Sequence, residues 1–386
     1  MSAPPLRIRR LLERFPPTGC ERTWHPNGGD ERALLLWEYF CRSADEPLPL
    51  RFANGLAYVM EKIAIAIHPD ELLAGEVGLE DPAAARPDDF AQAQDFWQRR
   101  QEAFCQTFSW HAAEQRAGRA GLSSKWASRD GHAIPDFPRL LAVGLDGLIE
   151  IAARANAAEE DEAAERRVFR QAMITALRAL AGYIRRYALL ADGLARAEAD
   201  PARRLELEEI AERCAWLAGR PPRTFPEALQ LVWFAHLGVK LDDGGVGHSF
   251  GRFDQYLYPF YQADLRAGRL DEDSAREWLA LFWIKLNREG DDIAHLSLGG
   301  QTPEGEDSAN DLTRLCLEVE RWVSRKQPNL SVRVHAAAPD WLWRETAAAI
   351  LCGAGHPAVF NDGVIAAGLV DYGFAPAEAY DFAPVG

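Results

Sequence analysis

Apolar residues recur every three or four positions along much of the chain. The pattern covers residues 31–66, 137–155 and 158–219, and a long apolar run follows at 228–240. A stripe with this period lets an α-helix bury one face against a core while its charged face stays in water. We therefore expect a helix-rich protein in which residues 158–219 form two long helices with solvated outer faces.

Two short segments carry a different pattern. Residues 330–335 alternate as in a strand, with Arg333 and His335 on one face, and residues 358–360 are a second strand candidate. The segment 341–351 between them has helical spacing. The order strand, helix, strand predicts one βαβ unit in this part of the sequence.

Turn-forming residues indicate where elements begin and end. Thr224, with Glu227 three residues later, predicts a capping box at the start of the long apolar helix. Residues 242–247 are a glycine-rich turn. Residues 79–100 are rich in Ala, Pro and Asp, which predicts a loop that joins helical pieces.

Composition narrows the function classes. With 386 residues, the chain is longer than one core usually supports, so we expect one large barrel or two domains. Its net charge is −15 and it has no dense Lys/Arg block, which argues against nucleic acid or an anionic membrane as a partner. It shows no signal peptide and no apolar run long enough to span a bilayer.

The six cysteines are scattered and include no CxxC pair, which predicts reduced, buried thiols in a cytoplasmic protein. They are Cys20, Cys41, Cys105, Cys214, Cys316 and Cys352.

Familiar catalytic motifs are missing from the sequence. It contains no GxxxxGKS/T, HExxH or GxSxG motif. Residues 245–251 read GxGxxxG, one residue too long for the dinucleotide fingerprint. The histidines form no i, i+4 pair on a helix and have no Cys at ligand spacing, so no metal site is predicted. A Ser-His-acid hydrolase is disfavoured because Ser249 adjoins His248 and no nucleophile elbow is visible.

Three histidines lie in turn or strand-edge contexts, where ligand-binding residues often occur. His132 comes directly before a predicted helix, His248 and Ser249 follow a run of glycines, and His295 lies between two aspartates and a Gly-Gly turn. Glycines let the backbone approach a ligand closely, and a His-Ser pair offers donors and acceptors to a hydroxyl or carbonyl group. These residues are therefore candidates for binding a polar ligand.

Arg252 and Asp254 flank Phe253. We expect a buried contact between the two charged side chains that anchors a loop, rather than a catalytic role. We assign the aromatic residues that follow to the core. They are Tyr256, Tyr258, Phe260 and Tyr261.

From Thr224 to Gly386 the sequence resembles the glycyl radical enzymes of the pyruvate formate-lyase superfamily, nearest their glycerol/diol-dehydratase-like branch. The matching words are TFPEALQ at 224–230, GRFDQYLYP at 251–259, LGG at 298–300, NDLT at 310–313, QPNLSVRVH at 327–335, GHP at 355–357 with ND at 361–362, and YDFAPVG at 380–386. Further words in the N-terminal half are DELLAGE at 70–76 and the segment 131–136. The resemblance thus covers nearly the whole chain.

The resemblance implies an α/β fold. The family has a ten-stranded barrel made of two antiparallel five-stranded halves and wrapped in helices. Residues 1–386 would form a pyruvate formate-lyase-like domain that supplies the N-terminal helical layer and most of the first half-barrel.

The resemblance also implies radical chemistry. In the family, a separate activating enzyme that uses S-adenosylmethionine and an iron–sulfur cluster installs a radical on a glycine. That glycine oxidises a cysteine to a thiyl radical, which abstracts hydrogen from a small-molecule substrate. This chain would hold no metal and no tightly bound cofactor, and its partners would be the substrate, the activating enzyme and, at full length, a second copy.

The resemblance implies roles for six residues. His132, His248 and Ser249 match positions that line the substrate pocket, where they would hydrogen-bond substrate hydroxyls and help the departing group leave as water. The residues Arg252, Asp254 and Arg333 would be structural and lie near the site. Acyl transfer to coenzyme A is disfavoured, while decarboxylase and C–N or C–S lyase branches remain open.

The sequence departs from the family because the thiyl cysteine, expected just after Gly386, and the glycyl radical loop are absent from it. We therefore expect this polypeptide alone to be inactive, as an N-terminal fragment or one half of a split enzyme. The alternative is a non-catalytic truncated paralogue that binds a small polar ligand or pairs with a full-length partner. A partial barrel would leave an apolar strand edge that invites such pairing.

Overall fold

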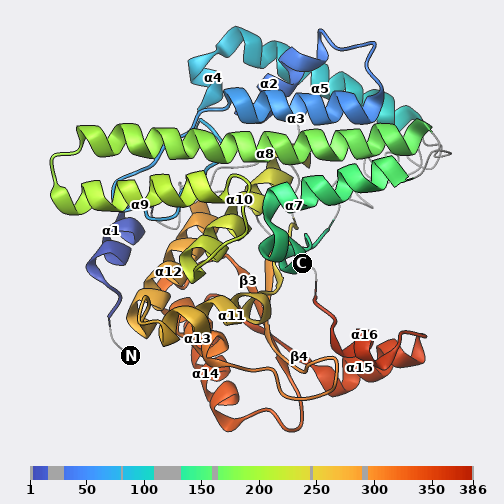
Figure 1. The fold of residues 1–386 in the computed structure, drawn as a ribbon. Helices are drawn as coiled ribbons and strands as arrows, with labels where there is room; N and C mark the ends of the chain where they lie inside the picture. The colour runs from blue at the N-terminus through green and yellow to red at the C-terminus, as the bar shows by residue number, and fades with distance from the viewer. Residues whose placement is uncertain are drawn as a thin grey trace, which may run out of the picture.

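Helices make up most of the fold. The computed structural model describes residues 3–15, 30–79, 81–107, 132–158, 164–243, 247–288 and 294–384. The helices that precede the first strand are α1 (Leu6–Arg14), α2 (Glu31–Phe40), α3 (Leu48–Lys62), α4 (Pro82–Ala85), α5 (Pro87–Thr107), α7 (Phe137–Ala158), α8 (Ala164–Ala197), α9 (Pro201–Leu217) and α10 (Phe225–Asp243). Most of them form the upper layers of Figure 1, and the sheet with its own helices lies below.

The two long helices predicted within residues 158–219 are confirmed. They are α8 and α9, which lie side by side along one face of the molecule (Figure 1). The apolar stripe is wider than the surface that these helices bury. Met173, Leu189 and Leu205 belong to the stripe but are 45%, 73% and 56% exposed.

The loop predicted over residues 79–100 is wrong, because α4 and α5 occupy most of that segment. Asp88 and Asp89 lie in the first turn of α5, where acidic side chains stabilise the helix dipole. Tertiary packing then holds the helix in place. The indole Nε1 of Trp97 donates a hydrogen bond to the Ala33 carbonyl at 2.9 Å.

The capping box predicted at Thr224 is half formed. The Thr224 hydroxyl accepts a hydrogen bond from the N–H of Glu227 at 3.3 Å, as expected. The Glu227 carboxylate, however, accepts from the N–H of Arg223 at 2.6 Å. The following helix, α10, lies in the centre of the core, where Leu229 and Phe234 are fully buried.

The sheet has four parallel strands in the order β1-β2-β3-β4. The strands are β1 (Gly251–Arg252), β2 (His295–Gly299), β3 (Asn329–Val334) and β4 (Ala358–Asn361). The accompanying helices are α11 (Phe253–Arg266), α12 (Glu272–Arg288), α13 (Asp311–Val323), α14 (Asp340–Ile350), α15 (Asp362–Asp371) and α16 (Pro376–Tyr380). The predicted βαβ unit is confirmed as β3-α14-β4.

The two faces of the sheet differ in chemistry. One face is apolar, with Leu296 beside Leu330 and Leu298 beside Val332, all fully buried. The other face is polar and carries Arg252, Ser297, Ser331 and Arg333. A polar face inside a protein needs partners for its donors and acceptors, so this face is a natural place for a ligand.

The DELLAGE word at 70–76 has a structural role. Glu71 forms an ion pair with Lys285 at 2.9 Å, and Glu76 forms one with Arg288 at 2.9 Å. All four side chains are almost fully buried, and their charges cancel. The cluster fixes this segment to the C-terminal end of α12.

None of the helices in the described part of the chain combines the length and the apolar character needed to cross a bilayer.

Candidate functional site

Two segments that are far apart in the sequence meet at the candidate site. Ala133 and His248 form a parallel β-bridge, and the N–H of Ser249 donates to the Ala133 carbonyl at 2.9 Å. The ring of His132 lies against Gly247, which has a φ of 84°. A Cβ at Gly247 would come within 2.9 Å of that ring, so the close approach requires glycine.

The three residues predicted to contact substrate differ in burial. His132 is exposed, whereas His248 and Ser249 are 1% and 0% exposed. The His248 ring packs edge-on against His236 of α10, with ring centroids 6.2 Å apart. Burial, together with the nearby Lys240 and His248, lowers the pKa of His236 well below its ordinary value, so His236 is neutral at neutral pH.

The buried residues His248 and Ser249 lie just before the first strand of the sheet. The N–H of Phe250 donates to the carbonyl of His295, the first residue of β2, at 2.7 Å. The Phe250 ring stacks on His236 at 4.7 Å and on Phe137 at 5.9 Å. This apolar packing fixes the position of His248 and Ser249 beside β1.

The segment that follows α16 returns to the same region. Arg333 on β3 donates to the carbonyls of Phe382 and Tyr380 at 2.8 and 2.7 Å. The same guanidinium pairs with Asp362 at 2.8 Å, and both side chains are fully buried. A Cβ at Gly251 would lie 3.0 Å from Ile134 and 4.0 Å from Ala383. The segments 132–134, 247–251 and 380–384 therefore converge on one end of the sheet.

Arg252 and Asp254 do not form the predicted contact with each other. Arg252 pairs with Asp381 at 2.7 Å. Asp254 accepts hydrogen bonds from the N–H of Gly299 at 2.8 Å and from the Thr313 hydroxyl at 2.5 Å. Burial raises the pKa of Asp254, and these hydrogen bonds oppose that rise. A helix begins at Phe253, so the two charged side chains anchor different elements.

On the polar face of the sheet, His295, a candidate from its sequence context, meets two serines that sequence reasoning did not assign to the site. His295 on β2 has its Nε2 2.7 Å from the Ser331 hydroxyl on β3. Burial lowers the pKa of His295 to about 4, so its ring is neutral at neutral pH. Ser297 lies opposite Ser331. The alternation of polar and apolar residues in HLSLG at 295–299 was the signal that could have revealed them.

The described residues include potential metal ligands and four free cysteines. Within them, no group of three or more His, Cys, Asp and Glu side chains is placed to hold a metal ion. Cys214 and Cys316 are buried as predicted, and burial raises the pKa of Cys214 to about 12. The prediction is wrong for Cys41 and Cys352, which are exposed. The remaining two cysteines have side chains outside the described set.

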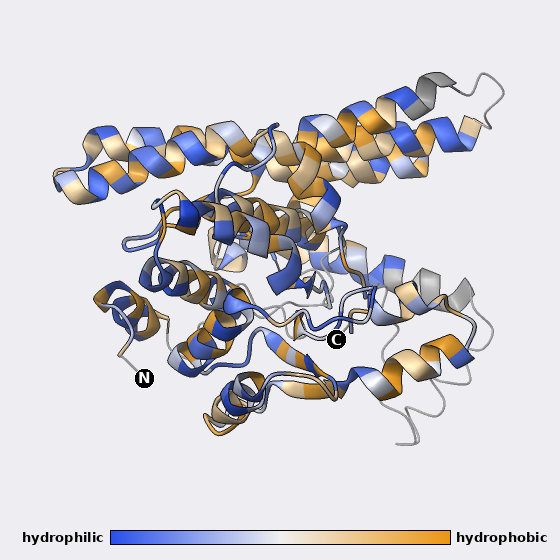
Figure 2. Cartoon of the chain, turned by 60° about the horizontal axis from the view of Figure 1, so that its bottom comes forward, coloured by the Kyte–Doolittle hydropathy of each residue, from blue (hydrophilic) through white to orange (hydrophobic). Residues whose placement is uncertain are grey.

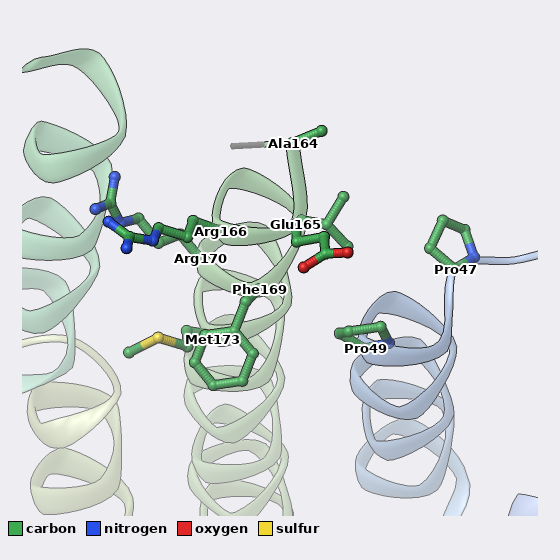
Figure 3. Close-up of a pocket in the computed structure, with 9 residues that line it drawn as sticks. Pro47, Pro49, Ala164, Glu165, Arg166, Phe169, Arg170 and Met173 are labelled. Carbon is green, nitrogen blue, oxygen red and sulfur yellow. The ribbon is translucent and has the colours of Figure 1, made fainter. Parts of the chain in front are cut away.

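Two cavities lie away from the end of the sheet where segments 132–134, 247–251 and 380–384 converge. An apolar cavity of about 370 Å³ runs beneath Pro135 and Asp136, between α3, α7, α8 and α10. A surface groove of about 790 Å³ separates the starts of α3 and α8. Phe169, Met173 and Pro49 are among its lining residues, and in Figure 3 Phe169 lies between Met173 on one side and Pro49 on the other. No predicted site residue lines either one.

Comparison with known proteins gives a consistent result. A family model described as pyruvate formate lyase-like matches residues 81–386. Isethionate sulfite-lyase from Nitratidesulfovibrio vulgaris is 30% identical, over 98% of this chain and 52% of that protein. The (2S)-3-sulfopropanediol dehydratase of Klebsiella oxytoca is 36% identical, over 66% of this chain and 33% of that protein.

A solved structure is also similar. The glycerol-bound form of the B12-independent glycerol dehydratase from Clostridium butyricum superimposes with a TM-score of 0.86 at 26% identity. The match covers all of this chain and 54% of that one. This chain thus spans about half the length of the relatives it matches.

Proposed function

Since the chain belongs to the pyruvate formate lyase-like family, we propose that it contributes the N-terminal part of a glycyl radical lyase or dehydratase. Its substrate in this proposal is a small hydroxylated molecule. One observation carries the proposal, namely the convergence of segments 132–134, 247–251 and 380–384 on the polar end of the sheet. Residues 1–386 act as one pyruvate formate-lyase-like domain.

In this proposal His132, His248 and Ser249 form hydrogen bonds with substrate hydroxyl groups and help the departing hydroxyl leave as water. The burial of His248 and Ser249 supports these roles, because hydrogen bonds are stronger where water is excluded. The exposed His132 lies at the rim of the site. Arg252, Asp254 and Arg333 are structural residues near the site that position the surrounding backbone.

The reaction also requires a radical that removes a hydrogen atom from the substrate. We assign the cysteine and glycine that carry it to polypeptide following residue 386, activated by an enzyme with S-adenosylmethionine and an iron–sulfur cluster. The docking of residues 380–384 supports this assignment, because Phe382 and Ala383 lie beside Arg333 and Gly251 at the candidate site. We further propose that the full-length protein is a cytoplasmic homodimer.

The test is anaerobic turnover by the full-length polypeptide after activation, with glycerol and isethionate as substrates. His248→Ala and Ser249→Ala should each lower turnover by about a hundredfold or more, the range expected for lost acid–base or hydrogen-bonding groups. Ser43→Ala is a matched control, because Ser43 is a buried serine whose hydroxyl donates to the Tyr39 carbonyl at 2.8 Å. Full activity in both site variants would contradict the proposal.

A non-catalytic role is the second candidate, and the exposed edge of the sheet favours it. Val359 of β4 and Val364 of α15 are 46% and 67% exposed, and Tyr372 is 87% exposed. Figure 2 shows α15 as a largely apolar helix at the edge of the molecule. An apolar strand edge invites pairing with another chain. In this role the protein is inactive and binds a small ligand or pairs with a full-length partner.

Size-exclusion chromatography with light scattering separates the two roles. Pairing through the edge predicts that Val359→Lys abolishes any complex between this chain and a full-length relative. Restored hydrogen abstraction on mixing this chain with a companion C-terminal polypeptide would exclude the non-catalytic role.

A further inference from the structure

Two buried polar atoms on the polar face of the sheet have no hydrogen-bond partner in the described structure. They are the hydroxyl oxygen of Ser297 and the Nε of Arg252. Ser297 is 1% exposed. Buried donors and acceptors are nearly always paired, so each of these atoms requires an explanation.

The strand register places the two residues next to each other. Arg252 on β1 lies opposite Ser297 on β2, and Ser297 lies opposite Ser331 on β3. Neighbouring strands are about 4.8 Å apart, so side chains at paired positions stand next to each other on one face. We call Arg252, Ser297 and Ser331 the polar row.

The surroundings of the polar row define what could bind there. Arg252 Nη1 pairs with Asp381 at 2.7 Å, and its Nη2 donates to the Gln301 carbonyl and the Ser308 hydroxyl at 2.8 and 2.9 Å. These contacts use three of the five N–H groups of Arg252, and its buried Nε–H is among those left to donate. Its charge is already balanced by Asp381, so the row favours an uncharged oxygen over a sulfonate, carboxylate or phosphate group.

The far side of the row is also neutral. Ser331 is bonded to His295 at 2.7 Å, and buried His295 carries no charge at neutral pH. Either serine hydroxyl can donate or accept, because its proton rotates. An oxygen held between Arg252 and Ser297 would therefore accept one hydrogen bond from Nε–H and exchange another with the Ser297 hydroxyl.

We infer that the polar row binds one uncharged hydroxyl-type oxygen, supplied by a substrate hydroxyl or by a water molecule in its place. The inference rests on the proposed function and extends its site. Ser249 is followed directly by Phe250 and then by β1, so the row continues the surface that begins at His248 and Ser249. Ser297 is thus a further ligand-contacting residue.

The test is an atomic-resolution crystal structure of the 386-residue chain, grown and frozen without polyols, and a second structure after soaking with glycerol. We expect an oxygen within about 3.2 Å of both Arg252 Nε and Ser297 Oγ. Glycerol occupying that position identifies a substrate hydroxyl as the source, and a water that persists beside bound glycerol identifies water. Ser297→Ala should remove the oxygen, while the control Ser43→Ala should keep it.

Two results would overturn the inference. One is a structure in which Ser297 Oγ and Arg252 Nε bond to protein acceptors with no oxygen between them. The other is an oxygen that keeps its place and occupancy in Ser297→Ala. The proposed function fails separately, if glycerol leaves His248 and Ser249 without contact while the polar row still holds its oxygen.

Discussion

Glu320, fully buried on α13, should make the protein less stable as pH rises. The indole Nε1 of Trp283 donates to its Oε2 at 2.9 Å, and its Oε1 lies 3.5 Å from Nδ1 of His356. His356 Nε2 lies 3.0 Å from the Arg325 carbonyl, which can only accept, so Nε2 carries the ring proton and Nδ1 is an acceptor. Burial raises the pKa of Glu320 to about 8 and lowers that of His356. At pH 7 the pair is therefore a neutral acid facing a neutral imidazole.

The magnitude follows from the pKa of Glu320. An exposed glutamate has a value of 4.5, so between that pH and about 8 the folded state holds a proton that the unfolded state has lost. The unfolding free energy should fall by about 1.4 kcal/mol per pH unit across this window, roughly 5 kcal/mol in all. The stabilisation is complete below pH 4.5 and is lost as pH rises through about 8.

Glu320→Gln isolates this contribution, because glutamine resembles the protonated acid and cannot ionise. In urea unfolding followed by tryptophan fluorescence, wild type and variant should have similar stability at pH 5, and the variant should be the more stable at pH 9. Glu318→Gln is the matched control on the same helix. Burial alone would raise the pKa of Glu318, but hydrogen bonds from Arg276 and Arg314 lower it, so this variant should lose stability. Parallel pH profiles for wild type and Glu320→Gln would refute the reasoning.

Three further substitutions test the fold around the site. Gly247→Ala should lower the unfolding free energy by about 2 kcal/mol or more, because of its positive φ and the approach to His132, and a thermal melt would detect this. Arg333→Ala should cost about 3–5 kcal/mol by leaving Asp362 buried and unpaired, and hydrogen exchange should rise in residues 380–384, while unchanged exchange there would disprove the docking. Lys285→Met should destabilise the protein by a similar amount in urea, as expected when one partner of a buried ion pair is removed, and a neutral effect would show that the DELLAGE cluster contributes nothing.

Much of the fold could be predicted because the strongest signals are local. The alternation at 330–335, followed by a helix and a second strand, gave β3-α14-β4 correctly, and the helical period gave α8 and α9. The strands β1 and β2 were missed. β1 has only two residues, and the polar–apolar alternation of β2 covers only five residues beside a Gly-Gly turn, which is too short to stand out from the surrounding loop residues.

The site could be predicted only in part, because its assembly depends on long-range contacts. Sequence context identified His132, His248 and Ser249 as candidates, but spacing could not show that Ala133 pairs with His248. The predicted Arg252–Asp254 contact failed because Arg252 finds its partner, Asp381, more than a hundred residues away. Sequence periodicity carries no information about partners at that separation.

The most direct test of the central claim is a glycerol titration of the 386-residue chain followed by NMR of its histidine side chains. If the segments around His132 and His248 form one site for a hydroxylated ligand, the signals of both histidines should shift with the same dissociation constant. His335 and His356 face other partners, Asp307 and the Arg325 carbonyl, and should not shift. Unchanged signals from His132 and His248 at saturating glycerol, or shifts with different dissociation constants, would contradict the claim.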